Sequence, residues 1–185
     1  MGAFSRRHTL ACQIVDALSI RERPVEIEDR AIPYHWEGDL IGSTKNSHIA
    51  TLMERHSRFT LLIKVPSKDT ATVVAALTQR VGRSPAGLRR SLTWDRGLEI
   101  AQHQSFTVDT DVKVSFCDPQ SPWQRGSNEN TNGLLRQYFP QRTDLSVYSQ
   151  EELGEVALRL NQRPRKTLGF QTPADKLQAS VALTH

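Results

Sequence analysis

Cysteine is scarce in this sequence. Its 185 residues include only Cys12 and Cys117, which lie far apart and form no Cys-x-x-Cys pair. Closely spaced cysteine pairs are the usual sign of a structural zinc site, so no such site is predicted. Two reduced thiols are the favoured interpretation, and a disulfide between them is the alternative.

Long hydrophobic runs are also absent. The longest apolar stretches, such as residues 60–63 and 73–77, have the size of core segments and fall far short of a bilayer span. The N-terminus carries Arg6 and Arg7 but no apolar segment after them, so it does not resemble a signal peptide. Internal repeats and low-complexity tracts are missing as well. We therefore expect a cytoplasmic protein without a membrane partner.

The composition that remains is that of a globular protein. Hydrophobic residues make up 37% of the chain and charged residues 24%, and the length fits one domain with short extensions. The net charge of +4 and the isoelectric point of about 9.3 suit a protein that binds a polyanion. Many ordinary proteins are as basic, so the charge favours a nucleic-acid partner without establishing one.

Two regions are expected along the chain. Residues 1–33 are polar and mixed in charge, and Pro24 and Pro33 argue against a continuous helix there. We predict an N-terminal arm or linker, with a short helix over Leu10–Leu18. Residues 34–185 hold the clear strand and helix patterns, and we predict that they form the folded core with its C-terminal helices.

The first half of this core predicts an antiparallel meander followed by a helix. Short polar links separate three apolar runs, at His35–Ile41, Ile49–Met53 and Phe59–Val65. The helix that follows has an apolar stripe from Val73 to Val81, and Asp69 or Ser67 can cap it.

The second half alternates strands with helices. Strands are predicted over Ser91–Asp95 and Val112–Phe116, and helices over Leu98–Ser105, 127–137, 150–161 and a short segment from Pro173. The order of three strands, helix, strand, helix, strand and helices predicts an α/β fold with a five-stranded mixed sheet flanked by helices.

Three acidic residues occupy positions from which they could act together. Asp39 lies within an apolar and aromatic strand, where an unpaired charge is costly. Asp95 ends the fourth strand, at the edge where a sheet presents side chains, and Glu129 falls in the first turn of a helix. Oxygen ligands suit Mg²⁺, and two such ions about 3.5–4 Å apart can promote phosphodiester chemistry. The alternatives are a paired strand aspartate and a glutamate favoured by the helix dipole.

The segments around these acids resemble the catalytic blocks of DDE transposases. They read His35-Trp-Glu-Gly-Asp39, Leu92-Thr-Trp-Asp95-Arg-Gly97, and Cys117-Asp-Pro-Gln-Ser-Pro-Trp-Gln-Arg-Gly-Ser-Asn-Glu129, with the last block continuing to Pro140. The similarity is to the insertion-sequence-thirty group, which is related to the integrase catalytic core. Thirty-three residues separate Asp95 from Glu129, and the segments 161–166 and 172–175 also resemble that group. The resemblance covers the chain from about residue 20 to its end.

This resemblance implies a ribonuclease-H-like fold and an integrase-like catalytic core over residues 34–185. It implies that Asp39, Asp95 and Glu129 are both the catalytic residues and the ligands of two Mg²⁺ ions, for which Mn²⁺ can substitute. The implied activity is hydrolysis at transposon ends, followed by attack of the freed 3′ hydroxyl on another phosphodiester. The implied partners are the DNA of the transposon ends and target, and further copies of the chain in a homodimer or multimer.

Basic and amide side chains near the third block are candidate DNA contacts. The guanidinium fork pairs with phosphate, and asparagine can bond bases or the backbone. We predict contacts from two clusters: Arg125, Asn128, Asn132 and Arg136 around Glu129, and Arg163, Arg165 and Lys166 further on. An ordinary solvated surface is the alternative for each.

Four neighbours of the acids have open roles. Trp94 is predicted to face the core, opposite to Asp95, and Trp123 either packs or stacks on a base. Glu37 and His35 share a strand face with Asp39, so they either support it or are ordinary sheet residues.

Two departures from the group define the rival hypotheses. Members carry an N-terminal helix-turn-helix region that recognises the element's ends, and the 38 residues before Asp39 are too few to hold it. Tyr34 also stands where a glycine is expected. A truncated, non-enzymatic regulator that assembles with full-length transposase is therefore an alternative, although the intact acids favour an enzyme. A ribonuclease H or repair nuclease is a third possibility, against which the long integrase-like blocks count.

Overall fold

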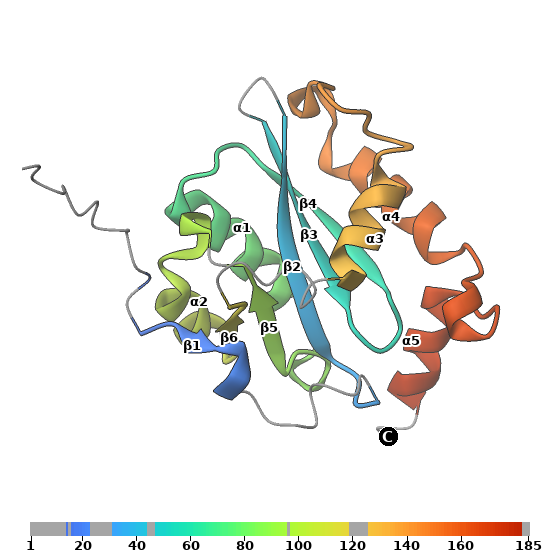
Figure 1. Ribbon diagram of the computed structural model, residues 1–185, viewed down its shortest axis with the longest axis horizontal. Helices are drawn as coiled ribbons and strands as arrows, with labels where there is room; N and C mark the ends of the chain where they lie inside the picture. The colour runs from blue at the N-terminus through green and yellow to red at the C-terminus, as the bar shows by residue number, and fades with distance from the viewer. Residues whose placement is uncertain are drawn as a thin grey trace, which may run out of the picture.

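A single mixed sheet organises the part of the chain that the structure describes. The computed structural model describes Ile14 and residues 16–22, 31–43, 47–95, 97–118 and 126–182, with only the backbone for 126–129. Within these residues the sheet has six strands in the order β1-β6-β5-β2-β3-β4 (Figure 1). Helices cover both faces, which confirms the predicted α/β architecture.

The sheet has an antiparallel half and a parallel half. The antiparallel half contains β2 (His35–Gly42), β3 (His48–Glu54) and β4 (Thr60–Val65). The parallel half joins β2 in turn to β5 (Ser91–Trp94), β6 (Lys113–Phe116) and β1 (Leu18–Ser19). Because parallel strands end at the same edge, the side chains that follow β5 lie beside the later residues of β2.

The helices form one layer on each face of the sheet. On one face α1 (Thr70–Gly82) packs against α2 (His103–Thr110), and on the other lie α3 (Gly126–Leu135) and α4 (Gln150–Asn161). The chain ends its described part in α5 (Pro173–Ala182), which packs against α4. Among the described residues, the 3-10 turns that connect these elements are η1 (Ile20–Glu22), η3 (Ala86–Leu88), η4 (Leu98–Ile100), η6 (Leu145–Val147) and η7 (Lys166–Leu168).

Strand alternation divides the buried side chains into two cores. Leu52, Trp94 and Phe106 belong to the core beneath α1 and α2. Ile41 and Leu135 belong to the core beneath α3 and α4. Successive residues of β2 therefore point to opposite helical layers, and Asp39 shares its side of the strand with Ile41.

The edge strand β4 is covered by the two ends of α4. The Gln150 amide accepts from Lys64 N at 2.9 Å and donates to Leu62 O at 2.9 Å. The Asn161 amide accepts from Thr60 N at 2.8 Å and donates to Thr60 O at 2.9 Å. These brackets satisfy backbone groups that an edge strand would otherwise present for pairing with another chain.

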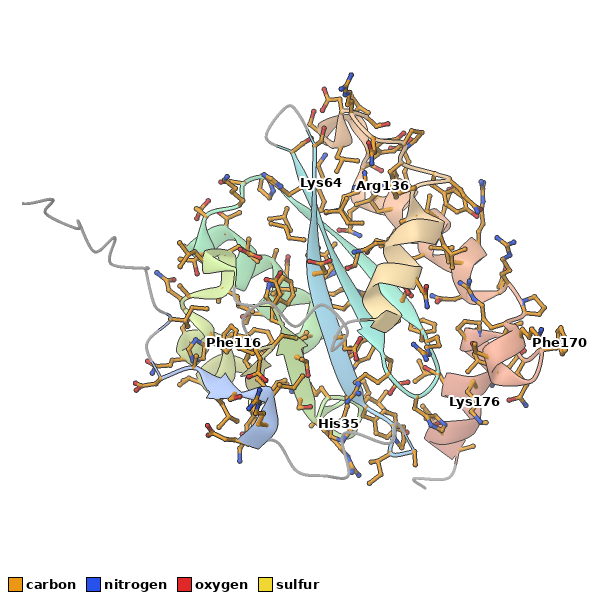
Figure 2. All side chains as sticks on the ribbon, in the orientation of Figure 1. His35, Lys64, Phe116, Arg136, Phe170 and Lys176 are labelled. Atoms are coloured by element: carbon orange, nitrogen blue, oxygen red, sulfur yellow. The ribbon has the colours of Figure 1, made fainter. Side chains whose placement is uncertain are left out.

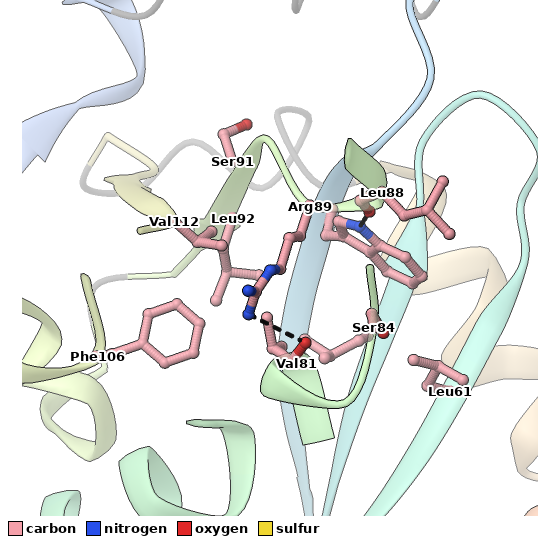
Figure 3. Close-up of a pocket in the computed structure, with 11 residues that line it drawn as sticks. Leu61, Val81, Ser84, Leu88, Arg89, Ser91, Leu92, Phe106 and Val112 are labelled. Carbon is pink, nitrogen blue, oxygen red and sulfur yellow. Dashed lines mark hydrogen bonds between the residues drawn. The ribbon is translucent and has the colours of Figure 1, made fainter. Parts of the chain in front are cut away.

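An apolar pocket lies on the face that carries α1 (Figure 3). Trp36, Leu92 and Phe106 line it, and Arg89 Nη1 donates to Val81 O at its margin across 3.4 Å. None of the residues that line it is acidic. Its lining belongs to the core beneath α1 and α2, so it lies across the sheet from Asp39.

Two expectations about secondary structure are wrong. The described sheet has six strands instead of five, because Leu18 and Ser19 pair with Ser115 and Phe116 of β6. Leu18 is therefore in a strand and not in the predicted helix, most of whose other residues lie outside the described ones. The predicted helix over Leu98–Ser105 is replaced by η4 and α2, and Gln102 N donates to Thr70 Oγ1 at 3.0 Å between them.

The predicted cap of α1 is confirmed. Asp69 is the residue before the helix, and its carboxylate accepts from Thr72 N at 2.9 Å. In the described part of the chain, no helix combines the length and the hydrophobicity that crossing a membrane requires.

Candidate active site

Asp39 lies in β2, and Asp95 directly follows the neighbouring parallel strand β5. The pairing of β2 with β5 sets Glu37 opposite Thr93. Continued by two residues, that register would set Asp39 opposite Asp95. Paired residues of neighbouring strands lie about 4.8 Å apart in the backbone and point to the same face. The two carboxylates are both half-buried, so they can contact a common ligand at this edge.

Neutral N–H groups hold both aspartates. Asp39 Oδ1 accepts from Leu40 N at 2.9 Å, and its Oδ2 accepts from the Asn132 amide at 2.7 Å. Asp95 Oδ1 accepts from Gly97 N at 2.8 Å, which closes a tight turn directly after β5. These hydrogen bonds restrict the rotation of both carboxylates and so fix the oxygens that a cation would contact.

The helix α3 carries Glu129 to the same region. In Figure 1 this helix lies along β2, which it contacts. The Asn132 bond to Asp39 fixes one face of α3 over β2, and the Thr131 hydroxyl lies 3.1 Å from Met53 Sδ of β3. Residues three apart in a helix share a face, so the backbone position of Glu129 is one turn from Asn132 on the side that meets Asp39.

A close approach of Gly38 and Trp94 sets the two strands against each other. A Cβ at position 38 would lie 2.1 Å from Trp94 Cζ3, so only glycine leaves room for the indole ring. Trp94 is fully buried in the core beneath α1, which confirms its predicted orientation away from Asp95. Its indole Nε1 donates to Glu99 Oε1 at 3.3 Å, just past the turn that holds Asp95.

Glu37 and His35 have their own partners on this face. Glu37 forms an ion pair with Arg55 (Oε1 to Nε, 2.8 Å), and both side chains are at most 4% exposed. The His35 ring lies 2.8 Å from Ser91 Oγ. A buried charge pair of this kind is costly to break, so Glu37 is engaged in structure next to the candidate site.

Some of the predicted DNA-contacting residues lie against Asp39 or α3, and others are exposed on the surface. Asn132 bonds to Asp39, and Arg165 lies against α3 in a cleft with Asn130 and Leu134. Arg163 Nη1 approaches Gln137 Oε1 at 3.5 Å, and Lys166 is exposed in η7. Arg136 is exposed just past α3, toward the opposite end of the molecule from His35 (Figure 2). Arg125 and Trp123 lie outside the described residues, as does the side chain of Asn128.

Three structural residues of this region escaped the sequence interpretation. Glu54 accepts from Tyr34 N and His56 N through Oε1, and from Ser57 N through Oε2, so it fixes the turn between β3 and β4. Arg58 stands on that turn, and Asn161 joins α4 to the strand after it. The available signal was a glutamate directly after a predicted strand, at the start of a short polar link. The carboxylate of such a residue can accept hydrogen bonds from the backbone N–H groups of the link, but the sequence analysis considered this segment only as a link.

The oxygen donors at this edge suit a hard divalent cation. Among the side chains that the structure describes, no group of three acidic, histidine or cysteine residues surrounds a common point. The side chain of Glu129 lies outside that set, so Asp39 and Asp95 are the two predicted ligands whose side chains the structure describes. A third oxygen ligand from α3 would complete a cage of the type Mg²⁺ prefers.

Comparison with known proteins decides the family. Residues 29–122 match the integrase core domain, a segment that includes both Asp39 and Asp95 and ends before α3. The chain belongs to the integrase core family. The ribonuclease-H-like fold class expected from the sequence is thereby confirmed.

Full-length relatives of this integrase core chain are transposases. It is 55% identical over 97% of its length to the transposase InsI for insertion sequence element IS30A of Escherichia coli. It is 52% identical over 92% of its length to the transposase for element IS1086 of Cupriavidus metallidurans, and 35% identical over 89% to that for IS4351 of Bacteroides fragilis. These matches confirm the resemblance to the insertion-sequence-thirty group. The chain spans about half the length of each, 48% to 50%.

Proposed function

We propose that this chain is the catalytic core of a DNA transposase. Its reaction would be divalent-metal-dependent hydrolysis of a strand at each element end, followed by attack of the freed 3′ hydroxyl on a target phosphodiester. The DNA of element ends and target would be its substrates, and it would act as a homodimer or larger multimer. Membership of the integrase core family and similarity to insertion-sequence transposases support this proposal.

The observation that carries the proposal is the parallel pairing of β2 with β5, which sets Glu37 opposite Thr93. Asp39 and Asp95 each lie two residues beyond this pair, so the same register would bring the two carboxylates to one edge of the sheet. The Asn132–Asp39 bond supports the same site, because it anchors the helix that carries Glu129 beside these two acids.

Asp39, Asp95 and Glu129 would hold two Mg²⁺ ions. When bound, such ions lower the pKa of a nucleophilic water or hydroxyl and stabilise the leaving oxygen. The chain's own task is to hold its carboxylates in place. Asn132, Leu40 N and Gly97 N perform it by donating to carboxylate oxygens, and the half-burial of both aspartates restricts their rotation.

Residues on the face of β2 and β5 that points away from Asp39 would keep the two strands at the right spacing. Trp94 fills the space next to Gly38 and thereby fixes the spacing of β2 and β5. Any shift of that spacing would separate Asp39 from Asp95. Catalysis of phosphoryl transfer depends mainly on positioning and charge stabilisation, so this spacing matters for the rate.

A cleavage and joining assay tests the proposal. The purified chain with Mg²⁺ or Mn²⁺ is expected to nick or join DNA that carries a pre-formed element end. Asp95→Asn should abolish both reactions, and Asp109→Asn, which changes an exposed acid of α2, should leave them unchanged. Full activity in Asp95→Asn would contradict the proposed metal site.

The same assay separates the enzyme from a regulator. If the wild-type chain and Asp95→Asn are equally inactive and both inhibit a full-length transposase in trans, the chain acts by mixed assembly and not by catalysis.

A further inference from the structure

A cleft with two arginines lies beside the helix that carries Glu129. Its walls come from the turn between β3 and β4, from α3, and from the loop after α4. The lining residues are Arg58, Asn130, Thr131, Leu134, Arg165 and Thr167. None of these six is acidic, so the described part of the lining has positive charge and hydroxyl or amide groups.

Arg165 is a half-buried cation with few hydrogen bonds. Its Nη2 donates to Leu160 O at 3.2 Å, and its buried Nε has no hydrogen-bond partner among the described residues. Burial, and secondarily the neighbouring Arg163, lower the pKa of the Arg165 guanidinium. Placing a cation in this position is costly unless an anion compensates it.

Hydrogen bonds fix the backbone segments that carry the two arginines. Glu54 fixes the turn that carries Arg58, with its carboxylate bonded to Ser57 N at 2.6 Å. Asn161 hydrogen-bonds to Thr60 and thereby joins the end of α4 to β4. Thr60 lies two residues after Arg58, and Asn161 lies four residues before Arg165. Both arginines therefore extend from segments anchored around Thr60, which limits the entropy that ligand binding would cost.

The position of the cleft relates it to the candidate active site. Asn130 and Thr131, which line it, directly follow Glu129 in α3. Further cations continue from the cleft along the same loop, since Arg163 and Lys166 are exposed on either side of Arg165. A row of cations that leads away from one half-buried arginine suits a linear polyanion better than an isolated small anion.

We propose that this cleft binds one backbone phosphate of the DNA strand that enters the active site, with Arg165 and Arg58 as its ligands. The guanidinium forks would contact the non-bridging oxygens, and Asn130 and Thr167 would add neutral donors. The contact is to phosphate alone, so it positions the strand without reading its sequence. This inference rests on the proposed function, because it takes DNA as the substrate.

The salt dependence of DNA binding tests it. Binding of a labelled DNA duplex to the full chain is measured by fluorescence anisotropy over a range of salt concentrations, without divalent cations. The plot of log K against log salt concentration has a negative slope, and loss of one phosphate contact makes that slope shallower by about 0.9. We expect such a decrease for Arg165→Ala and for Arg58→Ala. Arg83→Ala, at an exposed arginine after α1 on the other face of the sheet, should keep the wild-type slope.

Three outcomes would overturn the inference: an unchanged slope in Arg165→Ala, an equal decrease in Arg83→Ala, and no DNA binding by the wild-type chain. Thermal unfolding of each variant shows whether it is folded, and Arg165→Lys, which keeps the charge but loses the fork, should show weaker binding than wild type. Because the assay measures binding only, a chain that cuts DNA while Arg165→Ala keeps its slope would leave the proposed function intact. If the expected slopes are observed but the chain cuts no DNA, phosphate binding by the cleft would be supported and the proposed catalytic function would not.

Discussion

At the scale of single residues, Asn132 connects the candidate catalytic helix to the sheet. Its amide donates to Asp39 Oδ2 at 2.7 Å, while the sequence analysis assigned it to DNA. The sequence could show that Asn132 and Glu129 share a helix face. It could not show which residue lies opposite that face, because the partner is 93 positions away. A role of Asn132 in DNA contact stays a prediction.

Expressed as free energy, the effect of Asn132→Ala on catalysis should be larger than its effect on folding stability. The variant removes a hydrogen bond to a charged group, worth about 1.5–3 kcal/mol, and so removes one of the contacts that position the Asp39 carboxylate. We expect a higher Mn²⁺ concentration for half-maximal strand cleavage, measured by metal titration of the reaction. The matched control is Gln104→Ala, which removes an exposed amide-to-aspartate bond of 3.0 Å to Asp16. An equal Mn²⁺ requirement in both variants would refute the positioning role.

Gly38→Ala should destabilise the protein and separate β2 from β5. The added methyl group would overlap the Trp94 ring, which is fixed in the core. Overpacking of this kind costs about 1–3 kcal/mol, measured by urea unfolding. Gly154→Ala is the control, since a Cβ at that helical position meets nothing within 4 Å. It should stabilise α4 by about 0.5–1 kcal/mol. A neutral Gly38→Ala would show that the strand spacing does not depend on this contact.

At the scale of elements, periodicity predicted most strands and helices. The apolar stripe from Val73 to Val81 predicted α1 and its cap Asp69. Apolar runs separated by short polar links predicted the meander of β2, β3 and β4. The strand β1 was missed because two residues carry no alternation, and only the edge of β6 makes them a strand. Local patterns record which face of an element is apolar, but not the distant backbone that pairs with it.

The two amides that bracket β4 should differ in their contributions. Asn161→Ala leaves the buried N–H and C=O of Thr60 without partners, and each such group costs about 1–3 kcal/mol. Gln150→Ala opens a similar pair of bonds that lies nearer to water, so its loss should cost less than 1 kcal/mol by the same principle. Urea unfolding of both variants measures the difference. Equal losses would contradict the bracket's dependence on burial.

The cap of α1 predicts a pH dependence. Hydrogen bonds from Ser67 and then Thr72 lower the pKa of Asp69 to about 2, from an ordinary value of 3.8. A lowered pKa means that the ionised form stabilises the fold. The contribution is therefore complete above about pH 4 and is lost as the pH falls toward 2. Asp69→Ala should be less stable than wild type at pH 7, and the difference should shrink below pH 4. A constant difference would exclude the ionised cap.

At the scale of the whole molecule, the chain is an integrase core whose transposase relatives are about twice as long. Family membership and the α/β class followed from sequence blocks, because the blocks surround residues that the fold brings to one edge. The DNA path was less predictable. Arg165 and Arg58 face one cleft only because Glu54 and Asn161 fix two distant segments near Thr60.

The central claim is that acids from β2, from the turn after β5 and from α3 form one metal site. Calorimetric titration of Mn²⁺ into the DNA-bound chain tests it most directly, with Asp39→Asn, Asp95→Asn, Glu129→Gln and the control Asp109→Asn. We predict that each of the first three variants weakens Mn²⁺ binding by at least about tenfold, equivalent to 1.4 kcal/mol, and that Asp109→Asn binds as wild type. Wild-type Mn²⁺ affinity in Glu129→Gln would contradict the convergence of the three elements on one site.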